Sequence, residues 1–152
     1  MTDLGEWGGV GELDAETPNA DNATDAAPKA PELFYGSVEQ FVNEKLAHQF
    51  KRRVTARSGG NIWARDWWNF PEAVSRLEAL WRAWEHLRLD PALGMSVWWR
   101  DHADHHMNIL FSEHGPFVGA DTLGENKSGE PLPCDPAPEG WFPDLRSAEH
   151  RG

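Results

Sequence analysis

Apolar side chains recur at helical spacing in two stretches of the chain. The clearer stretch begins beside Pro71, which is suited to the first turn of a helix. Its apolar positions then step by three or four residues, as on one face of an amphipathic helix. They are Ala73, Leu77, Leu80, Trp84 and Leu87, with Val74 and Trp81 on the same face. We expect a helix over Ala73 to Leu89, ended by the turn residues Asp90, Pro91 and Gly94.

An earlier helix is expected from Val38 to Arg53. Ser37 and Gln40 have the spacing of a capping box, in which the two side chains satisfy N–H groups at the start of a helix. The apolar positions that follow at helical spacing are Val38, Phe41, Val42, Leu46 and Phe50. The predicted end is basic, which complements the negative end of the helix dipole.

Two shorter apolar segments follow the second helix. Over Met95 to Asp104, Ser96 could cap a short helix, whereas Met95, Val97 and Trp99 alternate as in a strand. We favour the helix. The apolar run from Met107 to Phe111 is bounded by turn residues and predicts a strand. The pattern as a whole predicts an α+β fold, small and mainly helical, with a short β element.

Tryptophan is concentrated in the same part of the chain. A buried indole removes roughly 150–250 Å² of surface from water, so several of them can supply the interior of a small domain. We therefore expect the tryptophans to fill the space between the helices. Of the nine tryptophans, those in this region are Trp63, Trp67, Trp68, Trp81, Trp84, Trp98 and Trp99.

Charge divides the chain into three parts. Residues 1–31 hold seven acidic residues and one lysine, and they predict a disordered acidic N-terminal arm. Residues 32–118 are nearly neutral and form the expected Trp-rich globular domain. Residues 119–152 are again acidic and contain several prolines, which predicts an extended C-terminal tail. Within this tail, Trp141 and Phe142 are the residues suited to folding back onto the domain.

The composition limits the partners and the compartment. A net charge of −11 opposes general adhesion to nucleic acid or to anionic lipid. No long apolar run is present, and the first residues lack the basic start and apolar stretch of a signal peptide. We therefore expect a cytoplasmic protein that does not act at a membrane. The single cysteine, Cys134, has no partner for an internal disulfide, and we expect an unreactive thiol.

Several Trp-rich blocks resemble one family. The blocks are WWNFPEA at residues 67–73, RLEALWRAWE at 76–85, GMSVWWRDH at 94–102 and GPF at 115–117. Over roughly Glu32 to Phe117 the chain resembles domain-of-unknown-function family forty-nine thirteen. The resemblance implies a gene of an actinobacterial plasmid, other mobile element or phage, and it implies no biochemistry. Two positions depart from the family's usual pattern: Phe70 replaces a histidine before Pro71, and His105 replaces a proline before His106.

A dense group of possible metal ligands follows Trp99. Imidazole and carboxylate groups together suit divalent metals such as Zn²⁺, Mn²⁺ or Fe²⁺. The candidate ligands are Asp101, His102 and His106. The spacing lacks the first histidine of a metallo-β-lactamase motif, since Arg100 stands there. A metal-dependent enzyme is therefore an alternative, beside the plainer interpretation that these side chains cap helix ends.

A basic patch is the second candidate site. Cations follow phosphate groups, and exposed indoles can stack on bases, so a basic patch beside tryptophans is typical of nucleic-acid binding. The alternative is that basic residues at a helix end compensate the dipole while the tryptophans lie in the core. The patch consists of Lys51, Arg52, Arg53, Arg57 and Arg65.

Motifs for nucleophilic catalysis and for phosphate loops are absent from the sequence, so we assign no catalytic residue. The leading hypothesis is a non-enzymatic accessory or interaction protein with an unidentified protein partner. Tryptophan and arginine are the residues most often found at binding hot spots. The expected contact surface contains Arg82, Trp98 and Arg100.

Overall fold

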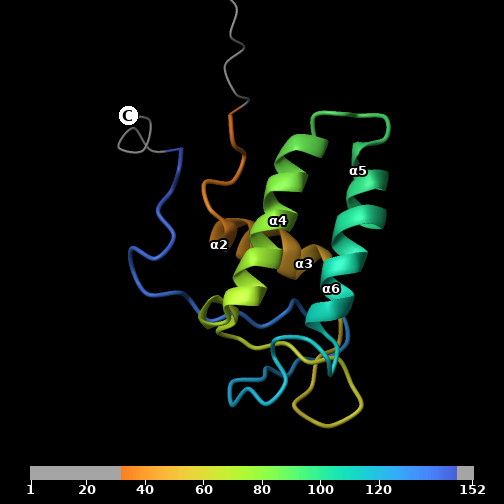
Figure 1. Cartoon of the computed structure of the whole chain (residues 1–152), viewed down its shortest axis with the longest axis vertical. Coiled ribbons are helices and arrows are strands. Elements are labelled where there is room, and N and C mark those ends of the chain that lie inside the picture. Colours follow the sequence, from red (N-terminus) through yellow and green to blue (C-terminus); the bar gives the residue numbers. More distant parts are fainter. Residues whose placement is uncertain (1–31, 147–152) are drawn as a thin grey trace, which may run out of the picture. The chain divides into compact units, whose positions relative to one another are not determined.

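The computed structural model describes residues 32–146, which contain three helical stretches and a long irregular C-terminal segment (Figure 1). The predicted acidic arm, 1–31, lies outside these residues, as do residues 147–152 of the predicted tail. Within residues 32–146, no helix has both the length and the apolar character needed to cross a membrane.

The first and third of these stretches combine α-helical and π-helical turns, and the second is an α-helix preceded by a 3₁₀ turn. The first joins α2 (Val38–Phe41), the π-helix η1 (Val42–Leu46) and α3 (Ala47–Gln49). The second is α4 (Pro71–Leu87), preceded by the 3₁₀ turn η2 (Trp67–Asn69). The third joins α5 (Gly94–Val97), the π-helix η3 (Trp98–Ala103) and α6 (Asp104–Leu110). In Figure 1, α4 and the α5–α6 stretch lie side by side, and the α2–α3 stretch lies across them.

Helix α4 confirms the amphipathic pattern of the sequence. Pro71 occupies its first turn, where the missing N–H removes no hydrogen bond. Beside its buried face, Glu72 and Arg76 form an ion pair one turn apart at 3.0 Å. The buried face is formed by Ala73, Leu77, Leu80, Trp81, Trp84 and Glu85. The hydrophobic period therefore determines both where this helix lies and which face it buries.

The first helix ends earlier than predicted. It stops at Gln49 because Phe50 leaves the helical region, with φ −100° and ψ 56°. Two long-range interactions of Val54 favour a non-helical backbone here. Its side chain is buried, and its N–H donates to the Asn126 carboxamide at 2.9 Å. Residues 51–53, predicted as the end of the helix, are therefore part of an irregular connection.

The predicted strand over Met107 to Phe111 is wrong. These residues are the end of α6, and the Phe111 N–H donates to the Met107 carbonyl in a helical bond of 2.9 Å. The buried positions Met107, Leu110 and Phe111 are spaced by three and one, which fits a helical face. Residues 32–146 contain one isolated bridge, between Ala64 and Leu123, and no strand. The predicted helix over Met95 to Asp104, in contrast, is confirmed.

Aromatic rings fill the interior, as predicted. Trp98, the first residue of η3, is fully buried and donates its indole N–H to the Leu80 carbonyl of α4 at 3.0 Å. Phe41, at the end of α2, meets the Trp98 ring edge-on with centroids 6.4 Å apart. Rings thus connect all three helical stretches. The buried tryptophans are Trp63, Trp67, Trp81, Trp84 and Trp98, while Trp68 and Trp99 are partly buried.

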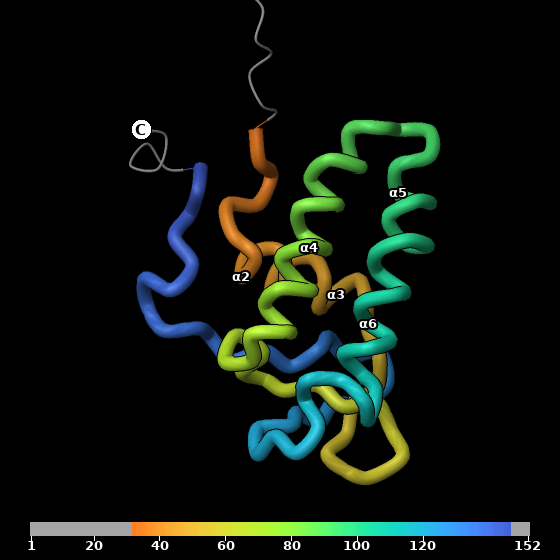
Figure 2. Tube along the Cα trace, in the orientation of Figure 1, coloured from red at the N-terminus to blue at the C-terminus, as the bar shows by residue number. Residues whose placement is uncertain are grey.

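The C-terminal segment has no helix or strand between Gly119 and Arg146, yet it packs against the helices. Figure 2 shows it, in blue, passing below α4 and then turning up beside α2. Leu132 is buried, and the Trp63 indole N–H donates to the Pro133 carbonyl at 2.9 Å. The predicted return of Phe142 is confirmed, since its ring stacks on Trp67 with centroids 5.7 Å apart.

The end of this segment is fastened to the start of the first helix. The Leu145 N–H donates to the Gly36 carbonyl at 2.9 Å. Asp144 pairs with Arg146 at 2.8 Å and accepts a bond from Gln40, and these contacts hold the pKa of Asp144 below its usual range. A Cβ on Gly36 would clash with the Asp144 carboxylate, so a larger residue here would displace the Asp144 side chain.

Candidate functional site

The basic patch is exposed, as nucleic-acid binding would require. Lys51, Arg53, Arg57 and Arg65 each present an exposed side chain, and none forms an ion pair with another residue of 32–146. Arg52 is also exposed, and its guanidinium lies over the Phe50 ring at 4.3 Å. The patch therefore keeps its positive charge within this part of the chain.

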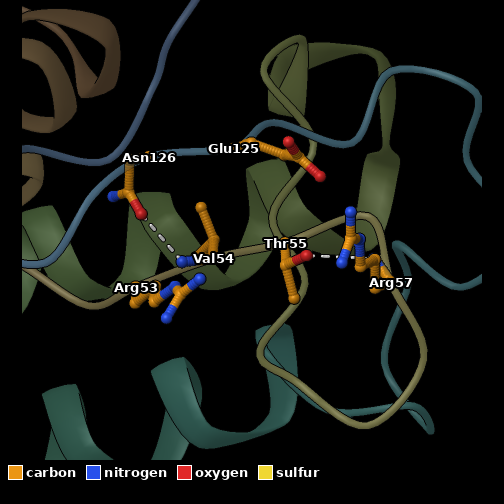
Figure 3. Close-up of a pocket in the computed structure, with 6 residues that line it drawn as sticks. All are labelled: Arg53, Val54, Thr55, Arg57, Glu125 and Asn126. Atoms are coloured by element: carbon orange, nitrogen blue, oxygen red, sulfur yellow. Dashed lines mark hydrogen bonds between the residues drawn. The ribbon is translucent and has the colours of Figure 1, made fainter.

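A polar pocket of about 190 Å³ lies within the patch (Figure 3), and we name it the Arg53 pocket. In Figure 3, Arg53 and Arg57 stand at the two ends of a short segment, with Asn126 and Glu125 across from it. The pocket therefore holds two guanidinium groups and one carboxylate. Its lining residues are Arg53, Val54, Thr55, Arg57, Glu125 and Asn126.

Asn126 holds the backbone of this pocket in place. Its carboxamide oxygen accepts the Val54 N–H, and its amide group donates to the Arg52 carbonyl at 2.9 Å and to the Pro131 carbonyl at 3.1 Å. Thr55 adds a local turn, because its hydroxyl accepts the Arg57 N–H at 3.1 Å. The arginines therefore extend from a backbone that is fixed at several points.

A second, wider pocket of about 470 Å³ adjoins the first at Arg57, which lines both. We name it the Val118 pocket, after a side chain that is 61% exposed. Its floor is partly apolar, through Ile62 and Leu123, and its rim carries Glu113 and His114. The other lining residues are Ala56, Ser58, Gly59, Gly60 and Gly119.

The tryptophans expected beside the basic patch do not form a stacking surface. Trp63 and Trp67 are fully buried, and Trp68 is partly buried with its N–H donated to the Asp135 carbonyl at 3.0 Å. These rings belong to the core, which is the alternative that the sequence left open. Stacking of bases on exposed indoles therefore has no support at this patch.

The predicted metal ligands Asp101, His102 and His106 do not converge. Asp101 pairs with the neighbouring Arg100 at 2.8 Å, and this contact lowers the pKa of its carboxyl. His106 Nδ1 lies 3.0 Å from a guanidinium nitrogen of Arg76. Because a guanidinium only donates, this imidazole nitrogen accepts and is occupied. Within residues 32–146, no group of three or more His, Cys, Asp or Glu side chains is placed to hold a metal ion.

The environment of His106 also disfavours its charged form. Burial lowers its pKa first, followed by the positive charge of Arg76 and by His105 and His102. The Arg76 guanidinium is itself tied to Glu72 at 3.0 Å. His106 therefore joins α4 and α6 through its hydrogen bond with Arg76.

The expected contact surface of Arg82, Trp98 and Arg100 is only partly exposed. Trp98 is fully buried, so this part of the prediction is wrong: the ring was needed between α4 and the first helix. Arg82 is exposed and lies over the Trp81 ring at 4.3 Å. Arg100 is exposed but paired with Asp101.

An aromatic groove of about 180 Å³ lies between α4, the start of α2 and the C-terminal segment. We name it the Trp141 groove, because Trp141 is 50% exposed at its edge. We predicted no site here from the sequence; the signal was the aromatic pair Trp141 and Phe142 within a Pro-rich acidic segment. The groove is lined by Ser37, Val38, Glu78, Trp81, Trp141, Phe142, Pro143 and Leu145.

Cys134 belongs to the C-terminal segment and is partly buried. Its thiol donates to the Leu132 carbonyl at 3.6 Å, and burial raises its pKa to about 12. The thiolate, which is the reactive form, is therefore strongly disfavoured in the folded protein.

The fold and the sites together define a small, mainly helical domain with a tryptophan-rich interior. The chain belongs to the family described as Domain of unknown function (DUF4913), whose model matches residues 35–138. The match extends past Val118 and includes much of the C-terminal segment that packs on the helices. Comparison with curated proteins and with solved structures gives no match.

Proposed function

We propose that this domain is a non-catalytic interaction module that binds a segment of another protein in the Trp141 groove. The observation that carries the proposal is the half-exposed indole of Trp141 beside a groove formed with Trp81 and Phe142. Tryptophan is the residue type most enriched at binding hot spots, because it buries a large area with little loss of conformational freedom.

The groove is held in shape before any partner binds. Trp141 meets Trp68 edge-on with centroids 5.1 Å apart, and the neighbouring Phe142 stacks on Trp67. The bond from Leu145 to Gly36 fixes the far end of the segment. A preformed surface loses little entropy on binding, so more of the contact energy appears as affinity.

Charge indicates the chemistry of the partner. Glu78 is exposed at the groove and forms no ion pair with another residue of 32–146. The whole chain carries a net charge of −11, which favours a basic partner. We infer an extended peptide segment with an apolar or aromatic side chain for the groove and a lysine or arginine beside it.

The setting is part of the same proposal. We place the partner in the cytoplasm of an actinobacterial host, among proteins encoded by the host or by a plasmid, integrative element or phage. The support is the resemblance of the Trp-rich blocks to their family. Sequencing the genes on both sides of this one tests the setting, and flanking genes without replication, transfer or phage functions would contradict it.

Peptide binding tests the groove directly. A peptide library is selected on the full chain. The selected peptides are measured by fluorescence anisotropy against Trp141→Ala and against the control Leu93→Ala, which removes another exposed apolar side chain away from the groove. We expect Trp141→Ala to weaken binding about thirtyfold, as at a hot spot, and Leu93→Ala to leave it unchanged. Equal binding to both variants would overturn the proposal.

The charge of the partner has its own test. Glu78→Gln should weaken a selected peptide that carries the basic residue and leave a matched peptide with glutamine in its place unaffected. A double-mutant comparison of this kind isolates the pair. An equal loss for both peptides would show that Glu78 does not contact the basic residue.

A further inference from the structure

We propose that the Arg53 pocket binds a phosphate group and that the Val118 pocket receives the nucleoside attached to it. The ligand is thus a nucleotide unit, supplied by a free nucleotide or by a nucleic-acid strand. This site shares no lining residue with the Trp141 groove and does not depend on the function proposed there.

The charges of the Arg53 pocket fit a phosphate. Arg53 and Arg57 both line it, and neither forms an ion pair with another residue of 32–146. Guanidinium groups present several N–H donors in a planar fork that matches phosphate oxygens. The Thr55 hydroxyl accepts the Arg57 N–H and keeps its own O–H to donate. Lys51 and Arg52 add positive charge along the same segment.

The site is preorganised by its backbone. The bonds from Asn126 to Val54, Arg52 and Pro131 hold the segment that carries Arg53. The Thr55 N–H also donates to the Asn61 carbonyl at 2.9 Å, which closes the loop that carries Arg57. A ligand therefore meets two cations whose main-chain positions are already fixed, and little ordering is required.

The sizes and linings of the two pockets indicate what is attached to the phosphate. The Arg53 pocket, at about 190 Å³, is smaller than the usual range for a small-molecule site of about 300–1,000 Å³. The Val118 pocket, at about 470 Å³, is within that range and shares Arg57. Val118 and Ile62 offer apolar surface for a base. Glu125 lines the Arg53 pocket, and its carboxylate suits the hydroxyl groups of a sugar.

Three probes test the site on the full chain: inorganic phosphate, adenosine monophosphate, and a fluorescein-labelled thymidine oligonucleotide. Binding is measured by calorimetry and by anisotropy at low salt. We expect adenosine monophosphate to bind about tenfold more tightly than inorganic phosphate, because it also fills the Val118 pocket. Val118→Ala should reduce that difference about threefold, since it removes apolar contact.

Charge variants locate the phosphate. Arg53→Gln and Arg57→Gln should each weaken the nucleotide about tenfold, whereas Arg82→Gln, the same change at an exposed arginine of α4, should leave the affinity within twofold. All three side chains are exposed, so an unchanged unfolding midpoint confirms that each variant is folded. Glu125→Gln should tighten inorganic phosphate, because it removes a negative charge from the pocket.

The outcomes separate the two sources of the ligand. Tight binding of adenosine monophosphate identifies a free nucleotide, and binding of the oligonucleotide alone, weakened by salt and by the Arg53 and Arg57 variants, identifies a strand. The proposal is overturned if neither probe binds saturably at low salt, if inorganic phosphate binds as tightly as the mononucleotide, or if Arg82→Gln has the same effect as the pocket variants.

Discussion

The helical stretches and the C-terminal segment satisfy their buried polar groups in different ways. In the helices the backbone is bonded internally, and the indole N–H groups of Trp81 and Trp84 find no partner within residues 32–146. The C-terminal segment has no helix or strand, and its carbonyls at Pro133 and Asp135 accept the indole N–H groups of Trp63 and Trp68. Trp81 and Trp84 thus contribute apolar area to the helices, whereas Trp63 and Trp68 also donate hydrogen bonds to the segment.

This difference shows how an irregular segment can belong to a folded domain. Prolines lack the N–H that a helix or a ladder needs, so a Pro-rich segment forms few regular backbone hydrogen bonds of its own. Trp63 and Trp68, outside the segment, supply donors to two of its carbonyls. The segment in return covers the rings of Trp63 and Trp67, which are fully buried.

Removing the C-terminal segment is the strongest test of its contribution to the folded domain. A chain that stops after Val118 leaves the Trp63 and Trp67 rings uncovered and the Trp63 indole N–H without its acceptor. We expect it to lose cooperative unfolding in urea, measured by tryptophan fluorescence and circular dichroism. A chain that stops after Arg146 is the control and should unfold like the full chain. If the shorter chain unfolds cooperatively with the same free energy of unfolding as the full chain, the segment does not stabilise the domain.

A variant of Trp98 measures how much a buried ring stabilises the packing of the helices. Trp98→Ala should lower the free energy of unfolding by about 3–5 kcal/mol, because it removes a fully buried ring that joins α4 to the first helix. Trp98→Phe keeps much of the ring and should cost less. Chemical denaturation gives both values. A loss below that of a surface variant would show that the ring is not central to the core.

Asn126→Ala measures how much the hydrogen bonds of the C-terminal segment stabilise the domain. It leaves the buried Val54 N–H without its acceptor and frees the carbonyls of Arg52 and Pro131. We expect a loss of about 1–3 kcal/mol in the free energy of unfolding. Asn108→Ala, at an exposed position of α6, is the matched control and should change it by less than about 0.5 kcal/mol. Similar losses in the two variants would argue against a structural role for Asn126.

A smaller effect depends on pH. Folding lowers the pKa of His106 below its ordinary value of 6.5, so the unfolded chain takes up a proton more readily than the folded one. The free energy of unfolding should therefore fall as the pH drops below 6.5. His106→Gln should reduce this fall, and His86→Gln, at an exposed position, should not. Denaturant midpoints across this range measure it, and identical pH profiles for all three proteins would refute the assignment.

The sequence predicted those parts of the fold that local patterns determine. Helix α4 follows from its apolar period and Pro71, and it was found with its buried face. The end of the first helix was missed because Val54 is held by Asn126, which lies 72 positions away and carries no local signal. The run ending in Phe111 was too short to separate helix from strand by its period alone.

The Arg53 pocket was predictable only in part, because long-range contacts leave no local signal in the sequence. The cations of the basic patch are consecutive or nearly so, and their exposure follows from their charge. The opposite wall of the Arg53 pocket comes from Glu125 and Asn126, which only the fold brings there. The predicted metal ligands are not brought together, because nearness in sequence says little about where side chains point: Asp101 pairs with Arg100, and His106 bonds to Arg76.

Because Cys134 lies in the C-terminal segment, the reactivity of its thiol can report how often that segment detaches from the helices. Alkylating reagents react with the thiolate, which the native environment disfavours with a pKa of about 12, although the residue itself is partly exposed. Modification is therefore slow in the folded protein and should speed up when the segment lifts from the helices. The rate at which a thiol reagent labels the native protein reports the frequency of that local detachment, separately from global unfolding.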